Sequence, residues 1–357
     1  MVSGKNMAKY DKALLNAVLE ITNRCNLRCK HCASDSGKAR PHELNSKAML
    51  KLIDELKDLG CQELTLLGGE IFLRDDWFEI ASAATKADMR LILISNGLLL
   101  SEENYAKLRD IPIHLIGISL DGASSQSYKE MRGVDGFDKV MALLQRLVED
   151  DHFPHVNAIT TFTRENLLAW DDFVALFDGT SITWQVQLAN KGGSRFDEEQ
   201  FITRKEYGWF FDKAVKTLDD FPNLQLRFMD DFGYCPITPK LAFLHDTWRG
   251  CIAGRELVGI RSDGLVCGCL SLGEKFMEGD LKKESLAEIW QSDKYFQAFR
   301  NREKNLQGAC AQCEFGSRCG AGCAAMALSS TGRMGENSYC VRQIESERLT
   351  STLWGSS

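Results

Sequence analysis

Three cysteines near the N-terminus are spaced closely enough to bind one metal group. Three residues separate Cys25 from Cys29, and two separate Cys29 from Cys32. Three thiolates on a compact loop can ligate three irons of a four-iron cluster and leave the fourth iron open. A closed zinc site is the alternative, but such sites usually take four ligands, and a fourth is missing here. The spacing therefore favours an iron-sulfur cluster with one open position.

A second segment whose residues could bind a ligand is Gly68-Gly69-Glu70. Glycines permit close approach of the backbone to a ligand, and a carboxylate complements an ammonium group. Two glycines and a glutamate are more often an ordinary loop than a site. Their position after the strand that follows the cysteine loop favours a site.

Polar residues also end the next two predicted strands, at 95–97 (Ser-Asn-Gly) and at 119–122 (Ser-Leu-Asp-Gly). Ser95, Asn96, Ser119 and Asp121 are therefore candidate ligand contacts. For Asp121 the alternative is a cap for the following helix. In addition, either Gln185 or its neighbour at position 187 could face the interior of a barrel.

The elements that must position these residues follow a regular pattern. Six short apolar runs, several rich in Ile, Val and Thr, are predicted strands: residues 18–22, 63–67, 90–95, 114–119, 155–162 and 182–188. Between the first two, apolar residues recur at helical spacing over 46–59, with Asn45 able to cap the start and Gly60 the end. About six such βα units predict a parallel sheet covered by helices, with ligands at the carboxyl ends of the strands. All four candidate segments lie on that rim.

The pattern changes after a predicted helix at 205–218. Cysteine and glycine dominate from Cys251 onward, and a small domain of this composition depends on metal for stability. A zinc-ribbon-like module is the alternative for this region. Cys61, between a predicted helix and a strand, is expected to be ordinary core packing.

Composition sets outer limits on function. The 357 residues are 44% hydrophobic, enough for one large core and a smaller one, and the net charge of -7 disfavours nucleic acid as a partner. No apolar window approaches a membrane span or a signal peptide, which predicts a cytoplasmic protein without a membrane partner. In a reducing compartment, 13 cysteines indicate metal ligation or redox chemistry.

The N-terminal motifs resemble the radical S-adenosylmethionine (SAM) superfamily, whose hallmark is CxxxCxxC after the first strand of a partial (β/α)6 TIM-type barrel. The resemblance implies that a 4Fe-4S cluster on Cys25, Cys29 and Cys32 binds SAM through its amino and carboxylate groups and yields a 5'-deoxyadenosyl radical. Glu70 would accept the SAM amino group, His31 would lie near the adenine, and Ser119 and Asp121 would contact the ribose. The other SAM contacts implied are Gly68, Gly69, Ser95, Asn96 and Gln185.

The C-terminal cysteines resemble the seven-cysteine SPASM extension of that superfamily, since every gap matches. The resemblance implies two auxiliary iron-sulfur clusters, expected to be 4Fe-4S. Cys251, Cys269 and Cys323 would hold the first, and Cys310, Cys313, Cys319 and Cys340 the second. Cys235 is the expected fourth ligand of the first cluster, with Cys267 as its rival. The expected divisions are 1–220 for the barrel, 221–250 for a bridge, 251–347 for the SPASM domain and 348–357 for a tail.

The resemblance also implies a reaction class. Enzymes of the SPASM group mostly modify peptides and proteins, so the resemblance implies oxidative modification (crosslinking, oxidation or excision) of a ribosomally made precursor peptide. An auxiliary cluster could take up an electron from the substrate radical, and a reductant such as flavodoxin or ferredoxin is an expected partner. Some 17 residues before the first strand are too few for a leader-binding module, so a separate protein could bind the leader. The alternatives are a small-molecule substrate (nucleoside, sugar or tetrapyrrole) and a non-enzymatic electron carrier. Acid or base candidates in the bridge cannot be ranked: Asp231, Tyr234, His245 and Asp246.

Overall fold

The computed structural model describes residues 12–229, 232, 234–238 and 248–354. The strands are β1 (Asn16–Glu20), β2 (Glu63–Leu67), β3 (Arg90–Ser95), β4 (Ile113–Ser119), β5 (Val156–Phe162), β6 (Thr183–Leu188), β7 (Leu226–Phe228), β8 (Leu257–Ile260), β9 (Leu265–Cys267) and β10 (Met277–Asp280). The longer helices are α1 (Ser46–Asp58), α2 (Trp77–Lys86), α3 (Glu102–Arg109), α4 (Ser125–Arg132), α5 (Phe137–Glu149), α6 (Trp170–Phe177), α7 (Arg204–Asp220), α12 (Ala324–Thr331) and α13 (Val341–Trp354). The short helices of the C-terminal region are α8 (Leu286–Gln291), α9 (Gln297–Arg300), α10 (Gly308–Ala311) and α11 (Gly316–Cys319).

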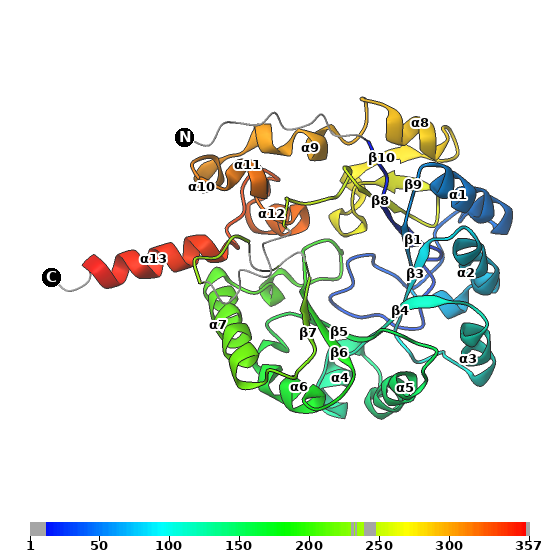
Figure 1. Ribbon diagram of the computed structural model, residues 1–357, viewed down its shortest axis with the longest axis horizontal. Helices are drawn as coiled ribbons and strands as arrows, with labels where there is room; N and C mark the ends of the chain where they lie inside the picture. Colours follow the sequence, from blue (N-terminus) through cyan, green and yellow to red (C-terminus); the bar gives the residue numbers. More distant parts are fainter. Residues whose placement is uncertain (1–11, 230–231, 233, 239–247, 355–357) are drawn as a thin grey trace.

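Strands β1 to β7 run parallel and adjacent in chain order, and they curve into an incomplete barrel with helices on its outer face (Figure 1). This confirms the predicted α/β partial barrel. Among the first six strands, those predicted at 63–67 and 90–95 have the predicted bounds. The first strand lies two residues earlier than predicted, because the backbone N–H of Asn23 leaves the sheet to donate to Glu43.

Helix α1 illustrates how local sequence fixes an element. The side chain of Asn45 accepts a hydrogen bond from the N–H of Ala48 and caps the helix. One face buries Met49, Leu52, Ile53 and Leu56 against the sheet. Gly60 then takes a positive φ of 86°, which lets the chain turn back towards β2.

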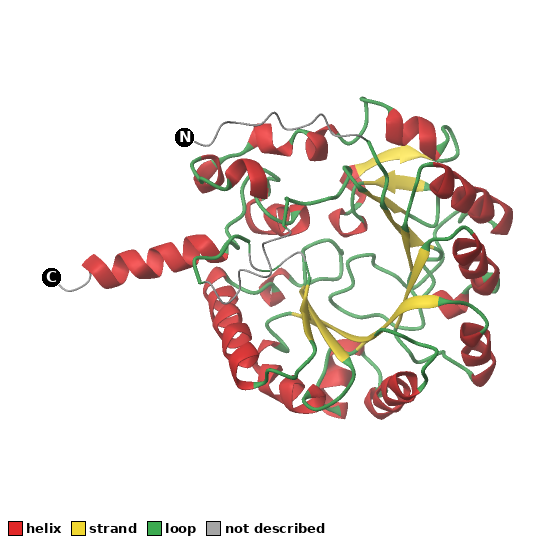
Figure 2. Cartoon of the chain, viewed as in Figure 1, coloured by secondary structure: helices red, strands yellow, loops and turns green. Residues whose placement is uncertain are grey.

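The sheet continues beyond the expected barrel boundary. Strand β8 pairs in parallel with β1 on the side away from β2, and β9 and β10 extend the sheet in antiparallel fashion, so the described residues form one ten-stranded sheet. Helices α9, α10, α11 and α12 lie on the open side of this curved sheet, whereas α8 lies outside it, beside α1 (Figure 1, Figure 2). The cysteine-rich region is thus joined to the barrel through backbone hydrogen bonds to its first strand.

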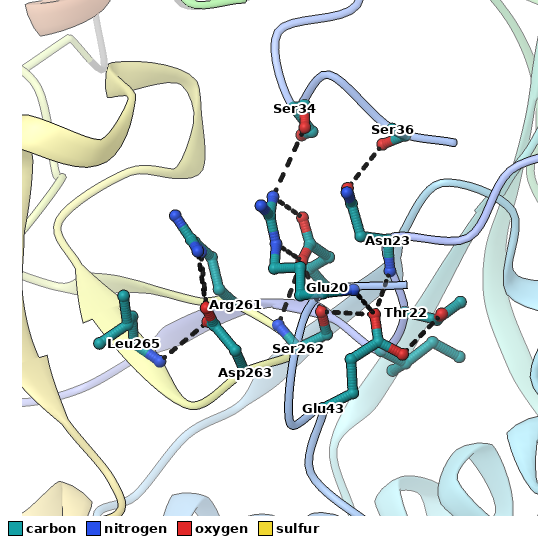
Figure 3. A network of polar contacts seen from close by, with 12 residues as sticks. Glu20, Thr22, Asn23, Ser34, Ser36, Glu43, Arg261, Ser262, Asp263 and Leu265 are labelled. Atoms are coloured by element: carbon teal, nitrogen blue, oxygen red, sulfur yellow. Dashed lines mark hydrogen bonds and ion pairs between the residues drawn. The ribbon is translucent and has the colours of Figure 1, made fainter. Parts of the chain in front are cut away.

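A buried polar network strengthens this join (Figure 3). Glu20, 1% exposed at the end of β1, accepts hydrogen bonds from Arg40 Nε at 2.6 Å and from Ser262 Oγ, in the β8–β9 turn, at 2.8 Å. Ser262 Oγ also lies 3.0 Å from Glu43 Oε1. Burial opposes ionisation of Glu43, but the donors around it, the N–H groups of Asn23 and Arg40 first among them, hold its pKa below the usual range. The network fixes the β8–β9 turn to the start of the cysteine loop.

Within the described part of the chain, no helix combines the length and the apolar character that crossing a membrane requires.

Candidate functional site

A cavity of about 250 Å³ opens at the carboxyl ends of the barrel strands, where the topology predicts a site. Its walls include the three N-terminal thiols, Cys25, Cys29 and Cys32. Six of the residues expected to contact SAM line the same cavity: His31, Gly68, Gly69, Ser95, Asn96 and Ser119. Residues far apart in sequence are thus brought to one rim.

The cysteine loop is held in shape by its backbone. The N–H of Cys25 donates to Gly37 O, and the N–H of Cys32 donates to Cys29 O, which turns the loop so that its thiols line the cavity. Among the described residues, no group of three or more His, Cys, Asp or Glu side chains is placed so that it could hold a single metal ion. Three thiols spread along a cavity wall suit a multi-iron cluster with an open iron. Burial raises the pKa of Cys25 to about 11, so metal binding must displace its proton.

Gly68 and Gly69 are required by a close contact between two rim segments. A Cβ on Gly68 would lie 2.4 Å from Thr22 O, and one on Gly69 would lie 2.2 Å from Arg24 O. The N–H groups of Gly69 and Glu70 donate to these same two carbonyls. The absence of side chains here therefore lets the end of β2 pack directly against the start of the cysteine loop.

Glu70 is buried behind the lining of the cavity. It is 1% exposed and does not line the cavity; its carboxylate accepts hydrogen bonds from Ser95 Oγ and Asn96 N, both at 2.8 Å. Burial raises its pKa despite these bonds. A buried carboxylate needs donors, and the end of β3 supplies them. Glu70 thus positions Ser95 and Asn96, which do line the cavity, and its contact with the SAM amino group stays a prediction.

Asp121 is also buried beneath the cavity wall. Its Oδ2 lies 2.9 Å from His31 Nε2 and 2.7 Å from Arg132 Nε, and Arg132 Nη1 lies 3.5 Å from Cys29 Sγ. Burial opposes ionisation, but Arg132 and His31 hold the pKa of Asp121 below its usual range. In the structure Asp121 contacts His31 and Arg132, and its contact with the ribose of SAM stays a prediction. Sequence reasoning missed Arg132, because only the fold brings the end of α4 to the cysteine loop.

Gln185 does not line the cavity either. It is buried, and its side-chain oxygen accepts a hydrogen bond from Asn157 Nδ2 at 2.8 Å. Gln187 lies two residues nearer the carboxyl end of β6, on the same face of the strand, and lines the cavity. Of the two glutamines considered from the sequence, Gln187 therefore lines the cavity and Gln185 does not.

Four C-terminal thiols lie near one another. Burial raises the pKa of Cys340 to about 12, and the thiols of Cys319, Cys310 and Cys313 are close enough to add to the shift. Cys251, Cys269 and Cys323, expected at the other cluster, are partly buried against the common core. None of the thirteen cysteines, all of which lie within the described ranges, forms a disulfide.

Cys267 and Cys61 are packed within the core. Cys267 is 0% exposed in β9, its Sγ 3.0 Å from the position of a Cβ on Gly259, and burial raises its pKa. Cys61 donates to Glu63 O at 3.3 Å, and burial raises its pKa to about 11. Both environments are those of packed thiols.

Cys235 lies beside a cysteine that was expected to ligate the other auxiliary cluster. Its thiol is hydrogen-bonded to that of Cys319, which belongs to the other group of expected ligands. The preceding residue explains the position: a Cβ on Gly322 would lie 2.4 Å from the ring of Tyr234, so that ring packs against the turn between Cys319 and Cys323. Tyr234 is 2% exposed, and its ring centroid lies 5.3 Å from that of Trp248. Asp231, His245 and Asp246 lie outside the described residues.

Because a hydrogen bond to a ligating sulfur shifts the potential of an iron-sulfur cluster, we expect Cys235→Ala to change one auxiliary cluster. Paramagnetic resonance spectra and a redox titration should show an altered signal for the cluster of Cys310, Cys313, Cys319 and Cys340, with iron content retained. Cys267→Ala is the matched control and should leave the spectra unchanged. A loss of about four irons in Cys235→Ala would instead make it a ligand, and altered spectra in Cys267→Ala alone would contradict the assignment.

Comparisons with known proteins agree with this geometry. Residues 19–177 match the Radical SAM superfamily model, and residues 251–314 match an iron-sulfur cluster-binding domain, SPASM. An AdoMet-dependent heme synthase of Oleidesulfovibrio alaskensis is 30% identical over 344 residues, covering 91% of this chain and 86% of the relative. The mycofactocin maturase MftC of Mycolicibacterium smegmatis is 29% identical over 316 residues, covering 86% and 77%.

Solved structures show the same fold. The native anSMEcpe structure with bound AdoMet superposes with a TM-score of 0.73 at 17% identity, covering 95% of this chain and 97% of that one. Streptococcus suis SuiB bound to S-adenosylmethionine gives a TM-score of 0.72 at 16% identity, covering 91% and 76%. With a heme synthase matched along nearly its whole length, three thiols on one cavity and the glycine pair beside them, the chain belongs to the radical SAM superfamily and carries a C-terminal SPASM domain.

Proposed function

We propose that this radical SAM enzyme acts on a tetrapyrrole. The observation that carries the proposal is the similarity to AdoMet-dependent heme synthases, which extends over 91% of the chain and includes the cysteine-rich region. A second such relative, from Methanosarcina barkeri, is 29% identical over 347 residues and is covered for 95% of its length. The sequence pattern by itself favoured a precursor peptide; these relatives support the tetrapyrrole alternative better.

In this proposal the cavity residues divide into those that hold the cofactors and those that orient them. Cys25, Cys29 and Cys32 would ligate the cluster, and Ser95, Asn96 and Ser119 offer hydrogen-bonding groups to SAM from the strand ends. The cluster and SAM, when bound, supply a 5'-deoxyadenosyl radical that abstracts hydrogen from carbon. Asp121, through its contact with His31, keeps that ring against the cavity wall.

The C-terminal thiols would hold the auxiliary clusters, in the groups of three and four described above. Such clusters can take up the electron released when a substrate radical is oxidised. The buried network of Glu20 and Ser262 fixes the turn that leads into β9 and Cys269 relative to the cysteine loop. A fixed spacing between redox centres is what electron transfer between them needs. An electron carrier without SAM chemistry would leave the cavity residues unused.

The test is an anaerobic assay with iron coproporphyrin III, the compound in the name of an Fe-coproporphyrin III synthase that is 25% identical over 344 residues. Purified protein, SAM and a reductant are incubated with this porphyrin and with other tetrapyrroles. We expect 5'-deoxyadenosine to form together with a new tetrapyrrole of altered mass, measured by liquid chromatography and mass spectrometry. SAM cleavage at background rate with every tetrapyrrole unchanged would contradict the proposal.

A peptide substrate is the second candidate, favoured by one observation. Mycofactocin maturase MftC matches 86% of the chain at 29% identity, close to the value for the heme synthases. The same assay with a ribosomal precursor peptide in place of the porphyrin distinguishes the two candidate substrates. A mass change in the peptide, with none in the porphyrin, would establish a peptide substrate.

A further inference from the structure

The loop between β6 and α7 lies directly on the cysteine loop. A Cβ on Gly193 would be 2.1 Å from Cys32 O, so the two backbones are in close contact. The carboxylate of Asp35 accepts hydrogen bonds from the N–H groups of Ser194 at 2.7 Å and Arg195 at 3.2 Å. Burial works against ionisation of Asp35, but these donors hold its pKa below the usual range. The position of Arg195 is therefore fixed by the cysteine loop itself.

The guanidinium of Arg195 lines the cavity and is incompletely paired. Nη2 donates to Ser36 O at 2.9 Å, and Nε lies 3.5 Å from Asp35 Oδ1, too long for a strong ion pair. Nη1 is buried and has no hydrogen-bond partner among the described residues. The carboxylate of Asp35 already accepts hydrogen bonds from the N–H groups of Ser194 and Arg195. A buried guanidinium N–H without an acceptor costs free energy, so this group is arranged for an acceptor that enters the cavity.

Arg195 and Arg132 reach the cavity from different elements. Arg132 is the cation beside Cys29, whereas Arg195 comes from the β6–α7 loop. Its neighbours in the cavity lining include Asn190 of that loop and Ser271, which follows Cys269. This is the side of the cavity that faces the cysteine-rich region. A substrate that lies between the two cofactor regions would pass here.

We propose that Arg195 binds a carboxylate of the substrate through Nη1. The inference rests on the proposed function, since heme and its precursors carry carboxylate side chains, and it makes Arg195 a specificity-determining residue. A guanidinium N–H to carboxylate bond is charge-assisted and directional. It would hold one edge of the tetrapyrrole and so set which carbon faces the thiol wall of the cavity.

The experiment is a binding titration of the anaerobic holoprotein with coproporphyrin III, followed by absorption. Arg195→Gln should bind this carboxylate porphyrin at least about tenfold more weakly than the wild type, the loss expected for one charge-assisted hydrogen bond. The tetramethyl ester of the porphyrin should bind the variant and the wild type alike. Lys191→Gln, which removes one positive charge from the same loop at a side chain paired with Glu198, is the matched control and should bind as the wild type does.

Two measurements guard against indirect effects. Cluster absorption and SAM affinity should be unchanged in Arg195→Gln, and Arg195→Lys, which keeps the charge, should bind coproporphyrin III with intermediate affinity. Equal weakening for acid and ester, unchanged affinity for the acid, or a loss of SAM binding would each overturn the inference while leaving the proposed function standing. Failure of the wild type to bind or convert any tetrapyrrole would overturn the proposed function and this inference together.

Discussion

Replacing Cys25, Cys29 and Cys32 together by alanine is expected to abolish reductive cleavage of SAM. The three thiols line one cavity with the rim residues that would hold SAM, and no other group of cysteines adjoins that rim among the described residues. Clusters bound elsewhere cannot replace the lost one, because they lack this cavity. Formation of 5'-deoxyadenosine should fall to the level seen without protein, while iron should drop only from about twelve to about eight atoms per chain.

The matched control is Cys61→Ala, which removes a buried thiol outside the cavity. It should lose some stability, as expected when a core side chain is shortened, and keep all its iron and its SAM cleavage. Normal 5'-deoxyadenosine formation by the triple variant would show that the cluster site has been assigned to the wrong thiols. Loss of all the iron in the triple variant would show instead that the C-terminal clusters depend on the first.

The repeating elements could be predicted because their signals are local. Apolar runs bounded by turns gave the parallel strands, and the spacing of Met49, Leu52, Ile53 and Leu56 gave α1 within one residue of its end. The cysteine loop and Gly68-Gly69 could be predicted for the same reason. Their spacing is short, and the order of parallel strands brings their ends to one rim.

The features that could not be predicted depend on contacts between distant parts of the chain. Strand β8 pairs with β1 across some 240 residues of sequence, and its short apolar run carries no sign of that partner. Arg132 and Arg195 lie in a helix end and a loop, where a lone arginine is normally solvated, and only the fold brings them to the cavity. The direction of the Glu70 carboxylate could not be predicted either, because it depends on the donors at the end of β3.

Arg132→Met is expected to destabilise the protein by about 3–5 kcal/mol, the usual cost of removing one partner of a buried ion pair. Arg132 is 9% exposed, and its Nε lies 2.7 Å from Asp121 Oδ2, so the variant leaves a buried carboxylate with His31 as its remaining ion-pair partner among the described side chains. The loss also removes the guanidinium beside Cys29. The free energy of unfolding, from anaerobic urea titration of the holoprotein, measures the effect.

The double variant Arg132→Met/Asp121→Asn separates the ion pair from simple packing. Removing the charge of Asp121 along with its partner takes away the uncompensated carboxylate, so the double variant should be more stable than Arg132→Met alone. Lys139→Met, which removes an exposed cation whose Nζ donates to Leu98 O, is the control and should change stability by less than about 1 kcal/mol. If the two substitutions were simply additive, the contact between Arg132 and Asp121 would contribute nothing specific.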